Sequence, residues 1–244
     1  MKKLGILIVL FLILTNYSFG QEVEKVFLNP ADSTSNCYLI VYPPKLPWTG
    51  FLFLIPGFGE TPEMVFAQAD LPKVAAEKGI LTIIPTFSTG VLSFGIDSLT
   101  QNSLVEILTD VTNKHKLIDH PFFIGGFSIG GSCAVKYAET AISQNYKYKP
   151  AAVFAIDPPL DFERFYNSSK RTLRLVHPSL SEEAKYMIDR IEKEMGGSPE
   201  IVLQNYHQLS PYSSSDTKQT AIRPLINMPI RIYSEPDINW WIAN

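Results

Sequence analysis

A serine lies at the centre of a motif of the form G-x-S-x-G, in which Gly126 and Gly130 flank Ser128. A serine hydroxyl is a weak nucleophile, but it attacks a carbonyl carbon readily when a neighbouring base removes its proton. The pattern G-x-S-x-G also occurs by chance, so it indicates a nucleophile only if the segments around it form the expected strand and helix. The alternative is a plain tight turn in which Ser128 is only a small residue.

The segments on both sides of Ser128 predict a sharp turn from a strand into a helix. The apolar run FFIGGF (122–127) comes directly before it, and helix-forming residues follow over 129–144. The two glycines avoid collisions of side chains with the neighbouring strand and helix. Such a turn exposes the hydroxyl at the carboxyl end of a sheet and beside a helix N-terminus, whose amides favour developing negative charge.

Short apolar segments alternate with helical patterns along most of the chain. The expected strands are 37–42, 51–55, 80–84, 122–127, 151–156 and 229–234. The expected helices are 62–78, 98–116, 129–144, 181–195 and 198–209. Continuous apolar strands that alternate with helices predict an α/β fold, with a mostly parallel sheet covered by helices on both faces.

One interval breaks this alternation. About 70 residues separate the strand that ends at Ile156 from the strand that begins at Pro229, which is too long for a simple crossover. The interval contains the charged helical pattern of 181–195. We therefore expect a helical cap, inserted at about 158–228, over one end of the sheet.

From about Cys37 to Asp237, the chain resembles the α/β-hydrolase superfamily. The resemblance depends on the G-x-S-x-G elbow and on FLFLIPGFGET (51–61), a strand and glycine-rich loop in which Pro56 replaces the usual histidine. It implies that the backbone N–H groups of Phe58 and Ile129 form an oxyanion hole. It also implies a serine hydrolase that cleaves an ester or amide through an acyl-enzyme, without a cofactor.

The acid of the superfamily's triad follows the nucleophile in the chain and precedes the histidine. By resemblance it comes after the strand that follows the cap, here 229–234. We favour Asp237, with Glu235 as the alternative. Asp157, after the strand at 151–156, is a third candidate, and its other interpretation is an N-cap or turn residue.

The base of the triad has no clear candidate. The histidines are His115, His120, His177 and His207, and none follows Asp237. One explanation is that the sequence stops before the last strand and helix of the fold, where the family carries its histidine. The other is that the base is lost, or replaced by His207 or His177 in the cap. The alternative function is then a non-catalytic, hydrolase-like protein that binds a ligand.

The N-terminal residues have the pattern of a secretory signal peptide. Lys2 and Lys3 precede the apolar run 4–14, and a small-x-small site ends at Gly20. The run is too short to be a good membrane span, although an uncleaved anchor is the alternative. We expect removal of residues 1–20, a secreted or periplasmic location, and one domain over 21–244.

Composition excludes some partners. Removal of Lys2 and Lys3 leaves 19 basic side chains against 24 acidic ones, which gives no reason to expect nucleic acid. The expected partner is a small-molecule or peptide acyl substrate. Cys37 and Cys133 are expected to be buried free thiols, although sequence leaves a disulfide open. No Cys/His spacing indicates a metal site.

Overall fold

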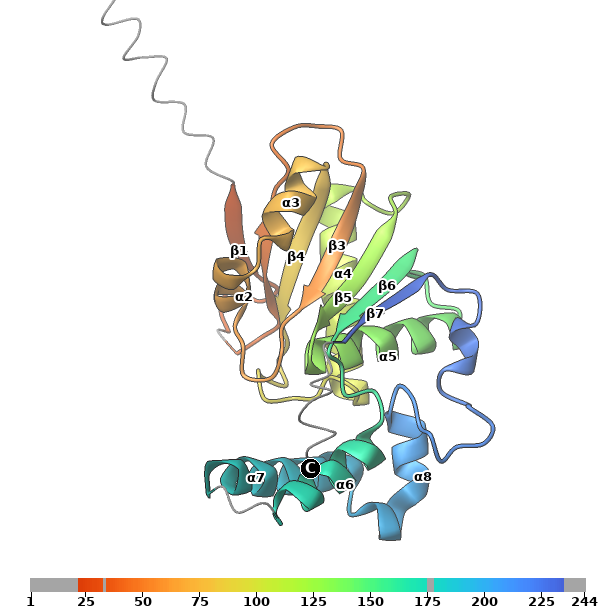
Figure 1. Ribbon diagram of the computed structural model, residues 1–244. Coiled ribbons are helices and arrows are strands. Elements are labelled where there is room, and N and C mark those ends of the chain that lie inside the picture. The colour runs from red at the N-terminus through yellow and green to blue at the C-terminus, as the bar shows by residue number, and fades with distance from the viewer. Residues whose placement is uncertain (1–21, 33, 175–177, 235–244) are drawn as a thin grey trace, which may run out of the picture.

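A seven-stranded sheet forms the centre of the molecule in the computed structural model, which describes residues 22–32, 34–174 and 178–234 (Figure 1). The strands are β1 (Val23–Phe27), β2 (Cys37–Val41), β3 (Gly50–Ile55), β4 (Ile80–Thr86), β5 (Phe122–Phe127), β6 (Ala152–Ile156) and β7 (Ile230–Tyr233). Their order is β1-β2-β4-β3-β5-β6-β7. β2 pairs antiparallel with β1 and β4, and all other neighbours are parallel. The predicted α/β class with a mostly parallel sheet is confirmed.

Helices cover both faces of the sheet, which explains why its central strands are apolar throughout. All residues of β2 and β3 are buried. On one face, α4 (Ser98–His115) and α5 (Ile129–Ser143) pack on a core that includes Phe53 and Ile83. On the other face, α2 (Pro62–Gln68) and α3 (Leu71–Glu77) pack near Leu52 and Ile84. A strand buried on both faces needs no polar alternation.

The helix predicted over 62–78 is wrong in one respect, because two helices occupy this range. Helix α2 ends at Gln68, where Ala69 has an extended backbone, and α3 begins at Leu71. Pro72 lies in the first turn of α3. Proline has no backbone N–H to donate within a helix and is tolerated in the first turn. The proline therefore divides what the apolar pattern presented as one helix.

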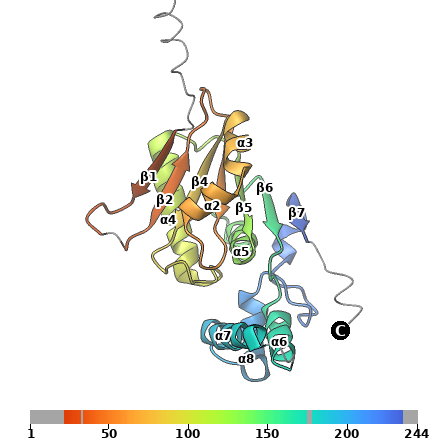
Figure 2. The ribbon, with the colours of Figure 1, turned by 60° about the vertical axis from the view of Figure 1, so that its left-hand side comes forward.

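Three helices and a short 3-10 turn lie between β6 and β7. They are α6 (Phe162–Thr172), α7 (Pro178–Met195), α8 (Pro199–Leu209) and η1 (Arg223–Leu225). Helices α6 to α8 gather beyond one end of the sheet in both ribbon views (Figure 2). We call residues 158–228 the helical insertion. The sequence patterns did not predict α6, η1 or β1 as separate elements.

The helical insertion has an apolar cluster of its own. Phe162, Ile191, Met195 and Tyr206 are almost completely buried there. The Tyr206 hydroxyl donates to the carbonyl of Gly197 at 2.9 Å, so the buried ring keeps a polar partner. The cluster also takes in residues outside the insertion, and this joins the helices to the body of the protein.

Both cysteines are buried and unpaired, as expected. Burial raises the pKa of the Cys133 thiol to about 12, so this thiol stays protonated and unreactive at neutral pH. Within the described ranges, no helix has both the length and the apolar character needed to cross a membrane.

Candidate active site

Ser128 occupies the turn between β5 and α5 with a strained backbone. Its φ of 51° and ψ of −125° are rare for a residue with a side chain. Its N–H donates to the carbonyl of Ile156 at 2.8 Å, and its own carbonyl accepts from the N–H of Gly131 at 3.0 Å. These bonds hold the turn to β6 on one side and to the first turn of α5 on the other. The predicted strand–turn–helix at Ser128 is present.

Close packing of α5 against β3 accounts for the two glycines of the motif. A Cβ on Gly130 would lie less than 3.0 Å from the carbonyl oxygens of Ile55 and Pro56. A Cβ on Gly126 would be equally close to Ile55 and to Gly130 itself. Real Cβ atoms essentially never approach backbone this closely, so both positions require glycine for space.

The Ser128 side chain is half-buried, and within the part of the chain described here its hydroxyl has no hydrogen-bond partner. The neighbouring Phe127 is 49% exposed. A small cavity of about 30 Å³ lies between the loop after β3 and the start of α5, and Glu60, Ile129 and Gly130 are among the residues that line it. It has room for about one water molecule.

Phe58 and Ile129, the two residues expected in an oxyanion hole, lie at the ends of adjacent strands. Phe58 follows β3 and Ile129 follows β5, and these strands pair in register at Ile55 and Gly126. The two side chains belong to the same apolar cluster. Neither backbone N–H donates a hydrogen bond to another described residue. Two unused donors beside a helix N-terminus are suited to bind an oxyanion.

Glu60 supports this loop, and the sequence analysis missed it. Its carboxylate accepts the N–H of Gly57 at 2.7 Å, and its own N–H donates to the Gly57 carbonyl at 3.2 Å. The N–H of Gly59 donates to the carbonyl of Val91 at 2.8 Å. These bonds fix the backbone on both sides of Phe58. The available signal was an acidic residue three positions after Gly57 in a glycine-rich turn.

The acid candidates are placed only in part. Asp237 and Glu235 lie outside the described residues. Asp157 directly follows Ile156, whose carbonyl accepts the Ser128 N–H. Asp157 is exposed, has a left-handed φ of 46°, and donates its N–H to Tyr233 at 2.8 Å. It lies in a turn beside the elbow and does not cap α6, since Asp161 does, and its role as the acid stays a prediction from sequence.

The histidines described by the structure lie away from Ser128. His207 places Nε2 2.8 Å from the hydroxyl of Ser215, which in turn contacts Glu163. His115 packs edge-on against Tyr42 at the opposite end of the sheet, where His120 also lies. His177 is outside the described residues. Among the residues with a defined position, no histidine contacts Ser128.

In the described segments, no group of three or more His, Cys, Asp or Glu side chains is placed so that it could hold a metal ion. The polar groups at the elbow are a hydroxyl and backbone amides. These groups are suited to nucleophilic attack and to stabilisation of an anion.

Comparison with known proteins gives matches in structure only. No family model matches the sequence, and no curated protein matches it. The chain is similar to a putative esterase from Staphylococcus aureus, with a TM-score of 0.56 and 12% identity over 92% of this chain and 77% of that one. An esterase/lipase from an uncultured bacterium has a TM-score of 0.54 and 12% identity, over 88% and 74%.

A third structure is the S-formylglutathione hydrolase from Agrobacterium tumefaciens, with a TM-score of 0.51 and 14% identity over 90% of this chain and 88% of that one. Identities this low establish the fold and leave substrate and activity open. The chain therefore has the fold of the α/β-hydrolase superfamily.

Proposed function

We propose that the protein is a serine hydrolase that cleaves an ester or amide through an acyl-enzyme on Ser128. The observation that carries the proposal is the strained backbone of Ser128, held between β5 and α5 by glycines that admit no side chain. Strain of this kind persists where the surrounding structure over-determines it, and it concentrates at functional sites. The esterases with a similar fold support the same reaction class.

In the proposed reaction, the Ser128 hydroxyl oxygen attacks the substrate's carbonyl carbon while a base takes its proton. The carbonyl oxygen becomes an oxyanion, to which the N–H groups of Phe58 and Ile129 donate. Removal of one such donor typically costs about 3–4 kcal/mol of transition-state stabilisation. The leaving group departs with the proton, and water then releases the acyl group from Ser128.

The remaining parts of the catalytic machinery are proposed from sequence. Asp237, or Glu235 in its place, orients the histidine that acts as base, and that histidine is not assigned. The helical insertion serves as the cap that walls the acyl pocket. Residues 1–20 act as a signal peptide, which places the protein in the periplasm or outside the cell.

A second function is favoured by one observation. The three described histidines, His115, His120 and His207, all have partners or positions away from Ser128. Without a base, the site at Ser128 would hold a carbonyl-containing ligand and not turn it over. The protein would then be a hydrolase-like binding protein.

Hydrolysis of short-chain p-nitrophenyl esters separates the two functions. A hydrolase releases a burst of p-nitrophenol equal to the enzyme concentration, and Ser128→Ala lowers the rate by about 10³-fold or more. Ser132→Ala is the matched control, because Ser132 is one turn further along α5 and its hydroxyl donates to the Pro159 carbonyl. Equal rates for the wild type and Ser128→Ala would overturn the assignment. Saturable ester binding without turnover would favour the binding protein.

A further inference from the structure

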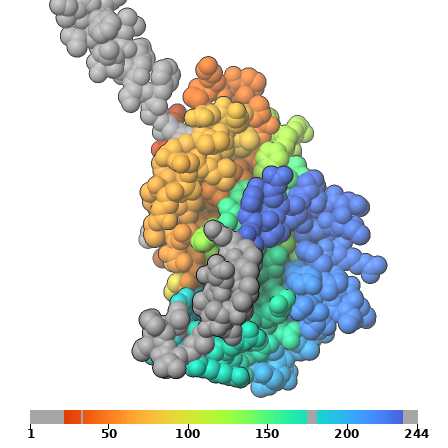
Figure 3. All heavy atoms as spheres, in the orientation of Figure 1, coloured from red at the N-terminus to blue at the C-terminus, as the bar shows by residue number. Residues whose placement is uncertain are grey.

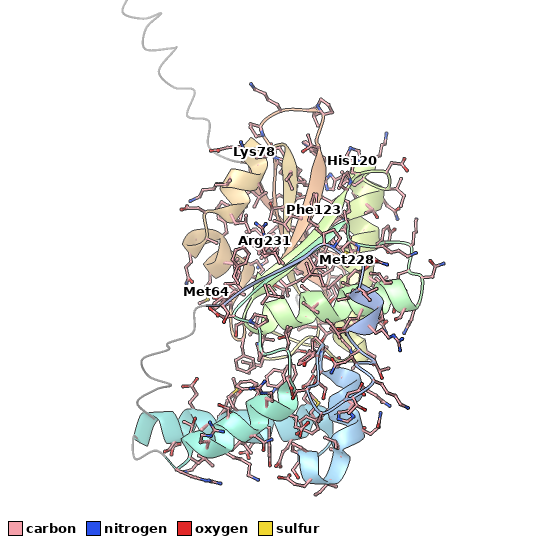
Figure 4. The ribbon with its side chains drawn as sticks, turned by 45° about the vertical axis from the view of Figure 1, so that its right-hand side comes forward. Met64, Lys78, His120, Phe123, Met228 and Arg231 are labelled. Carbon is pink, nitrogen blue, oxygen red and sulfur yellow. The ribbon has the colours of Figure 1, made fainter. Side chains whose placement is uncertain are left out.

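The end of the sheet opposite Ser128 is formed by four loops. Because β3 to β6 are parallel, the loops that precede these strands all reach the same edge, as the pairs Phe51–Phe122 and Phe123–Ala152 illustrate. These loops, taken with the adjoining ends of α3 and α4, are residues 43–49, 77–79, 114–121 and 144–151. We call them the amino edge. Figure 4 shows Lys78 and His120 at this edge, far from helices α6 to α8.

The amino edge is basic, although the chain as a whole has a net charge of −3. Its loops contain two carboxylates, Glu77 and Asp119, and Glu22 and Glu24 lie beside them at the start of β1. Its lysines are Lys45, Lys78, Lys114, Lys116, Lys147 and Lys149. Lys114 pairs with Asp110 at 2.8 Å, and the other five have no carboxylate partner among the described residues. The helical insertion, by contrast, contains nine acidic and nine basic side chains. Positive charge is thus concentrated at one end of the molecule.

Apolar side chains are exposed among these lysines. Leu46 is 77% exposed at the tip of the β2–β3 loop, which lies at the top of the space-filling view (Figure 3). Ile118 is 50% exposed in the loop before β5. Leu46 and Trp48 also border an open hollow that is lined by Lys114 and Lys116. Exposed apolar residues surrounded by lysines favour the boundary between lipid headgroups and acyl chains.

The chain also enters the fold at this edge. The carbonyl of Glu22 accepts the N–H of Tyr42 at 3.0 Å, and Val23 pairs with Val41 just before the loop of Leu46. The start of β1 accordingly lies at the same end as the β2–β3 loop (Figure 1).

We propose that the amino edge binds the surface of an anionic lipid bilayer. The lysines attract the headgroups, and Leu46 and Ile118 insert between them. Attraction of this kind acts within about one Debye length, so it requires the charged loops to face the lipid directly. Ser128, at the opposite end of the sheet, then faces away from the bilayer and stays open to substrates from solution. The binding does not depend on whether residues 1–20 remain attached.

Co-sedimentation of the full-length protein with vesicles tests this proposal. One set of vesicles is pure phosphatidylcholine, and the other contains about 30 mol% phosphatidylglycerol. We expect at least about tenfold tighter binding to the anionic vesicles at about 0.1 M salt, and loss of this preference at about 0.5 M salt. Binding to neutral vesicles measures the contribution of the N-terminal apolar run, which all variants share.

Charge-reversal variants localise the binding. Lys45→Glu, Lys78→Glu, Lys116→Glu and Lys149→Glu together should remove the preference for anionic vesicles. The control reverses four cations of the helical insertion, Arg171, Lys185, Lys218 and Arg223, and should keep it. Leu46→Ser should weaken binding about threefold to tenfold at unchanged fold stability. Esterase activity in solution should be the same for the wild type, the amino-edge variant and Leu46→Ser, so failure of the proposed hydrolase function remains distinguishable.

Three results would overturn the proposal. The first is equal binding to neutral and anionic vesicles at low salt. The second is retention of the anionic preference in the amino-edge variant. The third is an equal loss of this preference in the control variant. If the fourfold variant does not fold, Leu46→Ser and the salt dependence of the wild type still decide the question.

Discussion

The two ends of one parallel sheet are built in opposite ways. At the carboxyl end, Ser128 and Gly130 are fixed by close backbone contacts, and Phe94 is completely buried beneath the helical insertion. At the amino edge, the loops are uncovered, lysine-rich and apolar at the exposed Leu46. Parallel strands sort their connecting loops into two sets that never mix. The sheet can therefore carry a rigidly held reactive site at one end and a separate binding surface at the other.

The largest expected effect is the loss of unfolding free energy when a glycine of the elbow is replaced by alanine. Gly130→Ala places a Cβ against the backbone of Ile55 and Pro56, so we expect a loss of about 3 kcal/mol in unfolding free energy. Gly90→Ala is the control, because Gly90 has a φ of 83° but no atom near its missing Cβ. We expect it to cost about 1 kcal/mol. Denaturant titration measures both, and equal losses would show that close packing at the elbow is not the constraint.

A smaller effect is expected where a side chain only positions the oxyanion loop. Glu60→Ala removes the acceptor of the Gly57 N–H, so the Phe58 N–H loses its fixed direction. We expect kcat for ester hydrolysis to fall about 10- to 100-fold, with KM nearly constant. Glu60→Gln keeps an acceptor oxygen and should restore most of kcat. If the glutamine variant is as slow as the alanine variant, the charge of Glu60 matters more than its hydrogen bond.

Helix α5 should also give the stability of the protein a pH dependence. Glu139 is buried with Lys136 3.4 Å away, and burial raises the pKa of this carboxyl from 4.5 to about 8. The folded protein therefore binds a proton that the unfolded chain releases, and stability falls as pH rises from about 4.5 through about 8. We expect this decline to be absent in Glu139→Gln. Parallel pH profiles for the two proteins, measured by urea unfolding, would contradict this.

Local patterns were sufficient for the parts of the fold that are buried on both faces. The apolar run FFIGGF predicted β5 with its observed bounds, and the two glycines located the turn at Ser128. β1 was missed because VEKVF has no continuous apolar run and lies at the edge of the sheet. α6 was missed because its sequence, FERFYNSSKRT, is mostly polar. Only a narrow face of this helix packs on the apolar cluster, so the sequence shows few apolar positions at helical spacing.

The sequence predicted those parts of the candidate site whose residues are adjacent in the chain or follow paired strands. Ser128 and Ile129 are adjacent in sequence, and Phe58 follows a strand that pairs with β5. Two other features depend on loop geometry, which no periodicity of the sequence encodes. One is the hydrogen bond from the Gly57 N–H to the Glu60 carboxylate, and the other is the packing of Phe58 on Phe94, whose ring centroids are 5.8 Å apart. The proposed acids Asp237 and Glu235 remain predictions from sequence, since they lie outside the described residues.

Fluorophosphonate labelling of the purified protein tests the central claim most directly, with the adduct located by peptide mass spectrometry. The reagent reacts with an activated serine and leaves ordinary hydroxyls unmodified. The account predicts one adduct per chain, on Ser128, absent from Ser128→Ala and retained in Ser132→Ala. An adduct on another residue, or no adduct on a folded wild-type protein, would contradict the claim that Ser128 is an activated nucleophile.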